Sequence, residues 1–264
     1  MSKIRMVDVE EETVSTETPK IVDSSFFPID DLPSRYLKYS KGTKLYGRPL
    51  KVKEIKRLSA MNEDNYNSII NEVLTNCIQG LPIEEIYVAD KLYLIFWLRA
   101  NTYKNANFST TYHCHSCKEK NEFTFDVDSF SVNYLEETMS FNDLTLLNSQ
   151  DVISFDYPKI RDEGRIAFLK DNLRNSRREI DEDTISTATY IKTINGKEIS
   201  LQRACEYLLN MDSAEDYAYI MSHIEENEFG VSPEVKVHCH KCKEINHLPF
   251  SFRQDFFLPK YQFR

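Results

Sequence analysis

Two short stretches that lie far apart in the chain decide its fold: Tyr112-His-Cys-His-Ser-Cys-Lys-Glu119, followed by Asn121, and Val237-His-Cys-His-Lys-Cys-Lys-Glu244, followed by Asn246. Each contains two cysteines separated by two residues. Alternating, β-rich sequence flanks both, at 108–112 and 122–127 for the first and at 234–238 and 248–252 for the second. The chain therefore repeats a predicted β-hairpin whose turn carries two thiols.

The two thiol pairs together make the ligand set of one tetrahedral zinc ion. A tight turn between cysteines spaced in this way aims both sulfurs at one point, about 2.3 Å from a metal. One hairpin alone leaves the ion half coordinated, so the second must come from beyond the 121 residues that separate Lys118 from His238 inclusively. Four thiolates leave no open coordination position, which predicts a structural Zn²⁺ rather than a catalytic one. The predicted ligands are Cys114, Cys117, Cys239 and Cys242.

Other interpretations of the cysteine motifs remain open. Each CxxC motif could be a redox pair, although a thioredoxin-type motif begins a helix and these lie between strands. Histidines beside the cysteines could replace a thiolate, but each hairpin already supplies two thiols, so we expect the histidines outside the ligand set or facing solvent. These are His113, His115, His238 and His240. Cys77 and Cys205 fall on apolar helical stripes, and we expect both to be buried.

Composition limits the class of protein. The 264 residues are 41% hydrophobic and include 16 Phe and 15 Tyr, enough to fill a core. The formal charge of −9 disfavours a nucleic-acid-coating protein, which needs a cationic face. The start of the chain lacks a secretion signal, and the longest apolar run, Leu92–Leu98, is shorter than a membrane span. We therefore expect a cytosolic protein without membrane contact, whose reduced thiols are available to metal.

We predict an α+β fold with a helical core, a split zinc ribbon made of the two CxxC hairpins, and a helical insertion between the hairpins. The expected division has four parts. They are a disordered acidic tail over 1–24, the helical core with the first zinc hairpin over 25–130, a mainly helical insertion over 131–233, and the second zinc hairpin with an aromatic C-terminal arm over 234–264.

Periodicity predicts the elements of the helical core. The segment 44–58 is expected to be a short strand that runs into a helix. Apolar residues at 3–4 spacing predict a second helix from Tyr66 to Ile78, with Gly80 placed to end it. Asp90 can cap a third helix, whose run Leu92–Leu98 is apolar on every side and must be central.

The insertion and the chain ends carry weaker signals. We expect a linker over 130–150, a strand over 151–158 and several helices over 162–229, with Ser200 and Ser213 as N-caps. Aromatic residues gather at 26–36 and 256–263. Each of these two segments is either an arm that docks on a partner or a cover for its own domain.

The order of elements in the first half resembles the baseplate hub subunits and hub assembly proteins of T-even-like contractile-tailed phages. The resemblance is best over residues 30–130. It rests on LPSRY at 32–36, KLYGRPLKVKEIKRLS at 44–59, VLTNCIQG at 73–80 and IYVADKLYLIFWLRANTYKN at 86–105, followed by the first CxxC hairpin. Its most specific residues are Asp90, Tyr93, Leu94 and Arg99, with Cys114 and Cys117 after them.

This resemblance implies a late viral structural or assembly protein whose partners are other baseplate or hub proteins. It implies no catalytic residues, and the sequence carries no phosphate loop, dinucleotide fingerprint, HExxH motif or serine elbow, so we expect no enzyme. The protein would be in the host cytoplasm during assembly, and retention in the tail baseplate of the virion, copy number and oligomeric state stay open. The alternative is a nucleic-acid-binding zinc-ribbon factor of the kind found in transcription, and a thiol redox enzyme is the third class.

Overall fold

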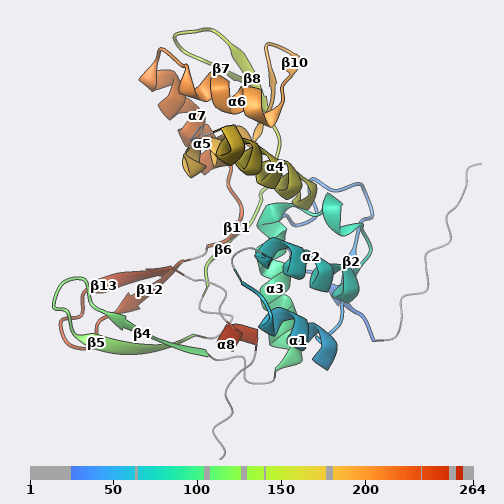
Figure 1. Ribbon diagram of the computed structural model, residues 1–264, viewed down its shortest axis with the longest axis vertical. Coiled ribbons are helices and arrows are strands. Elements are labelled where there is room, and N and C mark those ends of the chain that lie inside the picture. Colours follow the sequence, from blue (N-terminus) through green and yellow to red (C-terminus); the bar gives the residue numbers. More distant parts are fainter. Residues whose placement is uncertain are drawn as a thin grey trace, which may run out of the picture.

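The computed structural model describes residues 25–62, 65–103, 108–125, 130–139, 141–176, 181–232, 234–249 and 254–257. The fold mixes helices with several small antiparallel sheets (Figure 1). A helical body and an upper lobe follow one another along the long axis, and two hairpins project sideways as an arm. The acidic tail predicted over 1–24 lies outside the described residues. Within the described residues, every helix falls short of the length and hydrophobicity that a membrane span requires.

The body contains a three-stranded sheet in the order β1-β2-β3 and the helices that pack on it. The expected strand-to-helix segment and the second helix are confirmed. Its elements are β1 (Phe27–Ile29), β2 (Leu45–Gly47), α1 (Val52–Ser59), α2 (Tyr66–Cys77), β3 (Ile78–Gln79), the 3-10 helix η1 (Ile83–Glu85) and α3 (Val88–Thr102).

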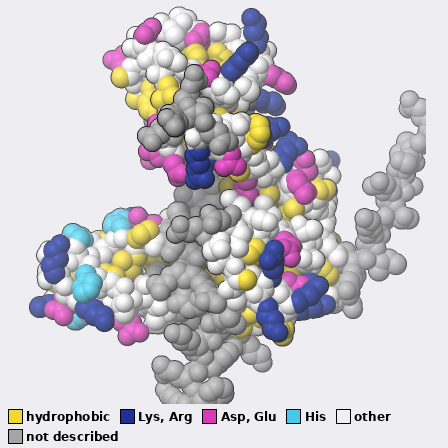
Figure 2. All heavy atoms as spheres, viewed as in Figure 1, with side chains coloured by type: hydrophobic (Ala, Val, Ile, Leu, Met, Phe, Trp, Pro, Cys, Tyr) yellow, Lys and Arg dark blue, Asp and Glu magenta, His cyan; other side chains and the backbone are white. Residues whose placement is uncertain are grey.

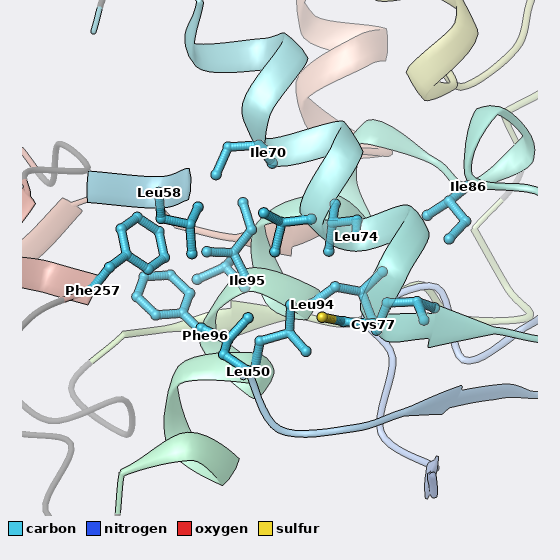
Figure 3. Close-up of a cluster of buried hydrophobic side chains, with 14 of the residues drawn as sticks. Leu50, Leu58, Ile70, Leu74, Cys77, Ile86, Leu94, Ile95, Phe96 and Phe257 are labelled. Carbon is cyan, nitrogen blue, oxygen red and sulfur yellow. The ribbon is translucent and has the colours of Figure 1, made fainter. Parts of the chain in front are cut away.

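Helix α3 is central, as its apolar run predicts. Leu94, Ile95, Phe96 and Leu98 are all buried. They meet Ile70 and Leu74 of α2 and Leu58 of α1 in one continuous apolar cluster (Figure 3). Burying a side chain of this size stabilises the fold by about 1.5–3 kcal/mol, so this cluster contributes to the stability of the body.

The capping role predicted for Asp90 is wrong. Helix α3 begins after Tyr87, and Asp90 lies within its first turn, fully buried. Its carboxylate accepts hydrogen bonds from the backbone N–H of Ser34 at 2.9 Å and from the Tyr39 hydroxyl at 2.8 Å. Burial nevertheless raises the pKa of the Asp90 carboxyl. Asp90 thus fixes the segment around Ser34 and Tyr39 on α3. Its two partners precede it by 56 and 51 positions, so no local sequence pattern predicts these contacts.

Gly80 does not end the second helix either. Helix α2 stops at Cys77 and the chain passes directly into β3. Gly80 follows with φ +110°, a backbone conformation that favours glycine. A Cβ atom at this position would lie 2.0 Å from the carbonyl oxygen of Lys44. The glycine is needed because two backbone segments approach closely beside the sheet.

The upper lobe is more mixed than the predicted helical insertion. Its strands form a four-stranded antiparallel sheet in the order β10-β9-β8-β7. The expected strand near 151–158 is confirmed as β8, but the β9–β10 hairpin interrupts the region expected to be helical. The elements are β7 (Leu144–Thr145), β8 (Val152–Phe155), α4 (Ile160–Ser176), α5 (Glu182–Ala188), β9 (Ile191–Ile194), β10 (Lys197–Glu198), α6 (Leu201–Leu209) and α7 (Ala214–Glu226).

Both predicted N-caps in the lobe are confirmed. The Ser200 hydroxyl accepts a hydrogen bond from the backbone N–H of Arg203 at the start of α6. The Ser213 hydroxyl accepts one from the N–H of Asp216 at the start of α7. Both are local contacts, three residues along the chain, which is why the sequence alone predicts them.

The linker predicted over 130–150 is wrong. Phe130, Leu135 and Leu146 are buried in three different apolar clusters. Strand β6 (Val132–Asn133) pairs with β11 (Gly230–Val231), and β7 belongs to the lobe sheet. Single apolar residues spaced irregularly along a polar segment show no periodicity, so their burial cannot be predicted from the sequence pattern.

The described parts of both aromatic segments pack on their own fold. Ile29 and Leu32 are buried, although Phe27 is 53% exposed. At the other end, helix α8 (Gln254–Phe257) buries Phe256 and Phe257 in the body core. The Arg99 guanidinium, fully buried in α3, lies 4.5 Å from the centre of the Phe256 ring. The rest of the predicted C-terminal arm, 258–264, lies outside the described residues.

Candidate metal centre

The two predicted hairpins are confirmed, and together they form the arm in Figure 1. Strand β4 (Phe108–His113) pairs with β5 (Lys120–Phe125), and β12 (Glu234–His238) pairs with β13 (Ile245–Pro249), both antiparallel. In β12 the buried Val235 and Val237 alternate with exposed residues and join the body core. The arm is therefore continuous with the body at one face of the second hairpin.

The two cysteine turns have the same backbone geometry. In the first, Cys114 donates its N–H to the Glu119 carbonyl at 2.9 Å and accepts at its own carbonyl from the N–H of Lys118 at 3.0 Å. Cys239 makes the equivalent bonds with Glu244 and Lys243, at the same two distances. Lys118 and Lys243 both adopt a left-handed conformation, with φ of 58° and 62°. Equivalent sequence thus gives equivalent turns.

All four predicted ligand residues come together at the end of the arm. Their sulfur atoms lie within 4.8 Å of one another, although Cys117 and Cys239 are 122 positions apart. The closest pairs run between hairpins, with Cys114 Sγ 3.6 Å from Cys242 Sγ and Cys117 Sγ 3.7 Å from Cys239 Sγ. Ideal tetrahedral geometry with the usual zinc–sulfur bond gives a sulfur–sulfur distance of about 3.8 Å. The four residues therefore fit a single metal ion.

Burial and hydrogen bonding make the four thiols unequal. Cys114 and Cys239 are fully buried, Cys117 is half-buried and Cys242 is exposed. The backbone N–H of Cys117 lowers the pKa of Cys114, and that of Cys242 lowers the pKa of Cys239 to about 6. The backbone N–H of Glu244 also lowers the pKa of Cys242. Hydrogen bonds with the neighbouring thiols outweigh this effect and raise the pKa of Cys242 to about 12. Four crowded thiolates repel one another, and a divalent cation removes that repulsion.

The four neighbouring histidines do not belong to the group of four clustered sulfur atoms. All are exposed, and the ring nitrogens that make contacts face oxygen atoms of the hairpins. The Nδ1 atom of His113, for example, lies 3.3 Å from the Lys118 carbonyl oxygen. Figure 2 shows histidine, basic and acidic side chains mixed at the free end of the arm.

Sequence reasoning missed two further residues of the centre. Asn121 and Asn246 are buried, 4% and 3% exposed, beside the cysteine sulfurs. Each follows the second cysteine of its motif by four positions. The recurrence of asparagine at this position in both copies of the repeat is the sequence pattern that could have indicated a role at the centre. The two single cysteines lie elsewhere in hydrophobic clusters, as predicted, and burial raises the pKa of both Cys77 and Cys205 to about 11.

Comparison with known proteins identifies the family. The family model described as T4 bacteriophage base plate protein matches residues 35–258, a span that contains the lobe, both hairpins and the body from β2 onward. No curated protein and no solved structure shows a significant match to the chain. A match over this much of the sequence is sufficient to assign membership. The chain belongs to the T4 bacteriophage base plate protein family.

Proposed function

We propose that this protein is a structural or assembly component of the hub of a phage tail baseplate and acts through protein–protein contacts. The observation that carries the proposal is the family match over residues 35–258. The hub position and the late, non-enzymatic role rest on the resemblance of residues 30–130 to hub proteins. Residues singled out by that resemblance fit a structural role, because Asp90 and Arg99 hold the segments around Ser34 and Phe256 on α3.

We further propose that Cys114, Cys117, Cys239 and Cys242 bind one structural Zn²⁺ and complete a split zinc ribbon. The spacing of the sulfurs and the all-thiolate donor set support this assignment. Bound zinc supplies a crosslink between segments that are distant in sequence. In this chain the cysteine turns hold the sulfurs, and the strands of each hairpin hold the turns.

The nucleic-acid alternative gains little from the charges of the arm, because the described hairpin residues mix lysines with glutamates: Lys118, Lys120, Lys236, Lys241 and Lys243 beside Glu119, Glu122, Glu234 and Glu244. The Lys241 ammonium is 2.7 Å from a carboxylate oxygen of Glu119, so the two charges offset each other. The formal charge of the whole chain is −9. A phosphate backbone is bound by surplus cationic charge, which this pair does not provide.

Co-purification tests the baseplate role. The full chain is expressed with each candidate neighbour in the baseplate, and affinity capture is followed by size-exclusion chromatography. We expect at least one neighbour to elute with this protein in a fixed ratio. If every neighbour is soluble and elutes separately, the proposal is wrong. Mass spectrometry of purified virions then separates a retained component from an assembly factor.

Metal analysis tests the zinc assignment independently. Protein purified without added metal is expected to contain one zinc per chain, with four thiols shielded from a thiol reagent until a chelator is added. A preparation without zinc whose cysteines cycle readily between thiol and disulfide would favour the redox interpretation instead.

A further inference from the structure

Two buried asparagines connect the hairpins of the arm in a crossed arrangement. Asn121 extends from β5 of the first hairpin, yet its Oδ1 atom accepts the backbone N–H of His240, in the second cysteine turn, at 2.9 Å. Asn246 extends from β13 of the second hairpin, and its Oδ1 atom accepts the N–H of His115, in the first turn, at 2.9 Å. Each hairpin thus holds a turn that belongs to the other.

The same amides also reach the sulfur atoms. Asn121 Nδ2 donates to Cys239 Sγ at 3.6 Å, and Asn246 Nδ2 donates to Cys114 Sγ at 3.6 Å. These are the first cysteine of each motif and the two fully buried thiols of the centre. An N–H donor stabilises a thiolate, so each asparagine favours the ligand form of a sulfur in the opposite hairpin.

The hydrogen bonds fix the orientation of each amide. The second N–H of Asn121 Nδ2 donates to the Glu119 carbonyl in its own turn at 2.9 Å, and Asn246 makes the equivalent bond to Glu244 at 3.0 Å. A flipped amide would bring its oxygen against a carbonyl oxygen and a sulfur. Only a side chain with a donor and an acceptor at these two places satisfies both turns, so aspartate and leucine do not replace it.

We propose that Asn121 and Asn246 are crossed positioning residues of the metal centre, each fixing the cysteine turn of the opposite hairpin in the register that metal binding requires. The inference rests on the proposed zinc site. It adds that the two halves are aligned by the protein itself, through a pseudo-twofold pair of amides. Such partners around the ligands typically change metal affinity by about 10- to 100-fold when they are replaced.

The test compares full-length wild type with Asn121→Asp and Asn246→Asp. Aspartate keeps the size of the side chain, removes both N–H donors and adds charge beside the thiolates. Competition with a chromogenic chelator is expected to show zinc affinity about 10- to 100-fold weaker in each variant. The matched control is Ser116→Asp, which adds the same charge on the exposed side of the first turn. The inference is wrong if Asn121→Asp and Asn246→Asp match wild type or the control.

Amide hydrogen exchange supplies a second readout that a general loss of packing does not reproduce. Asn121→Ala, which removes the oxygen that accepts the His240 N–H, should speed exchange at His240, and Asn246→Ala should likewise speed it at His115, each in the hairpin that is not mutated. Faster exchange confined to the mutated hairpin overturns the crossed arrangement. If the aspartate variants do not fold, the zinc affinity of Asn121→Ala and Asn246→Ala is measured in the same chelator competition.

The two proposals fail in different ways. Wild-type protein that holds no zinc contradicts the metal site, and the exchange pattern at His115 and His240 then still decides whether the amides hold the opposite turns. Wild-type protein with one zinc, and asparagine variants with unchanged affinity and exchange, contradict only the positioning role.

Discussion

The helical body and the hairpin arm are stabilised by different interactions. In the body, apolar side chains from α1, α2 and α3 form a cluster that needs no ligand. Around the cysteine turns at the end of the arm, the buried side chains include two cysteines and two asparagines. A two-stranded hairpin is at best marginally stable in water, so each half of the arm depends on its partner and on the body. The difference shows that one chain buries apolar side chains where helices can cover a core, and brings together cysteine and asparagine side chains at the end of the arm, where no described helix covers them.

Replacing one of the proposed zinc ligands should give the largest difference in stability between the arm and the body. We expect Cys242→Ser to abolish stoichiometric zinc, lower solubility and melting temperature, and open the arm to hydrogen exchange while α2 and α3 stay protected. Cys242 is exposed, so the substitution removes little packing, whereas structural zinc sites contribute about 10–16 kcal/mol of apparent binding free energy in small peptides.

Cys114→Ser should behave in the same way, and Cys77→Ser is the control. Cys77 is fully buried in the body but lies outside the group of four sulfurs, so its replacement should leave the zinc content at one per chain. Equal effects of Cys242→Ser and Cys77→Ser on metal content and melting temperature would overturn the assignment.

A cavity in the body should lower the stability of the protein without changing its zinc content. Leu94→Ala removes a fully buried side chain from α3 and is expected to lower the free energy of unfolding by about 2–5 kcal/mol. Zinc content should not change. Chemical denaturation gives the stability, with Val52→Ala, at a 68% exposed position of α1, as a control of small effect. A fall in zinc content with Leu94→Ala would show that body and arm unfold as one unit.

The buried ion pair of the body should give a smaller and pH-dependent effect. Arg48 and Glu54 are 3.0 Å apart with both side chains almost inaccessible. Burial alone would raise the pKa of Glu54, but hydrogen bonds from the Arg48 guanidinium and the Lys51 N–H outweigh it and lower the pKa. We expect Glu54→Gln to cost about 2 kcal/mol at neutral pH, because it leaves a buried guanidinium without its counter-charge.

The sign of the pH dependence follows from the lowered pKa. The contribution of Glu54 is present above the ordinary carboxyl pKa and is lost as the pH falls through the folded-state value. The difference between wild type and Glu54→Gln in urea denaturation should therefore shrink in acid. Glu72→Gln is the matched control, because its pair with Arg57 at 2.8 Å is about half exposed and should contribute little. An acid-independent difference would contradict the electrostatic explanation.

The smallest effect is expected at the surface of the arm. Lys241 and Glu119 join the two turns at 2.7 Å, but the Lys241 side chain is 62% exposed. We expect Lys241→Ala to change zinc dissociation only slightly at low salt, and not at all at high salt, since mobile ions screen exposed charges. A large change that persists in high salt would mean that this pair, and not the asparagines, aligns the hairpins.

Local patterns predicted the parts of the fold that depend on near neighbours. The hairpin turns, the helix around Tyr66 and the caps at Ser200 and Ser213 all rest on residues a few positions apart. The errors share the opposite property. Asp90 binds groups more than fifty positions away. Glycine is required at position 80 because the carbonyl oxygen of Lys44 leaves no room for a Cβ atom. Nothing in the neighbouring sequence specifies such partners.

The amino-acid sequence by itself determined the chemistry of this protein: a duplicated thiol turn, an apolar helix that must be buried, and an acidic chain with the sequence pattern of a baseplate protein. Only the tertiary structure decided that the two thiol pairs meet and that Asn121 and Asn246 cross between them. The physical reason is that ligand type and turn geometry are encoded within a few residues. Convergence of segments 122 positions apart depends on the packing of everything between them.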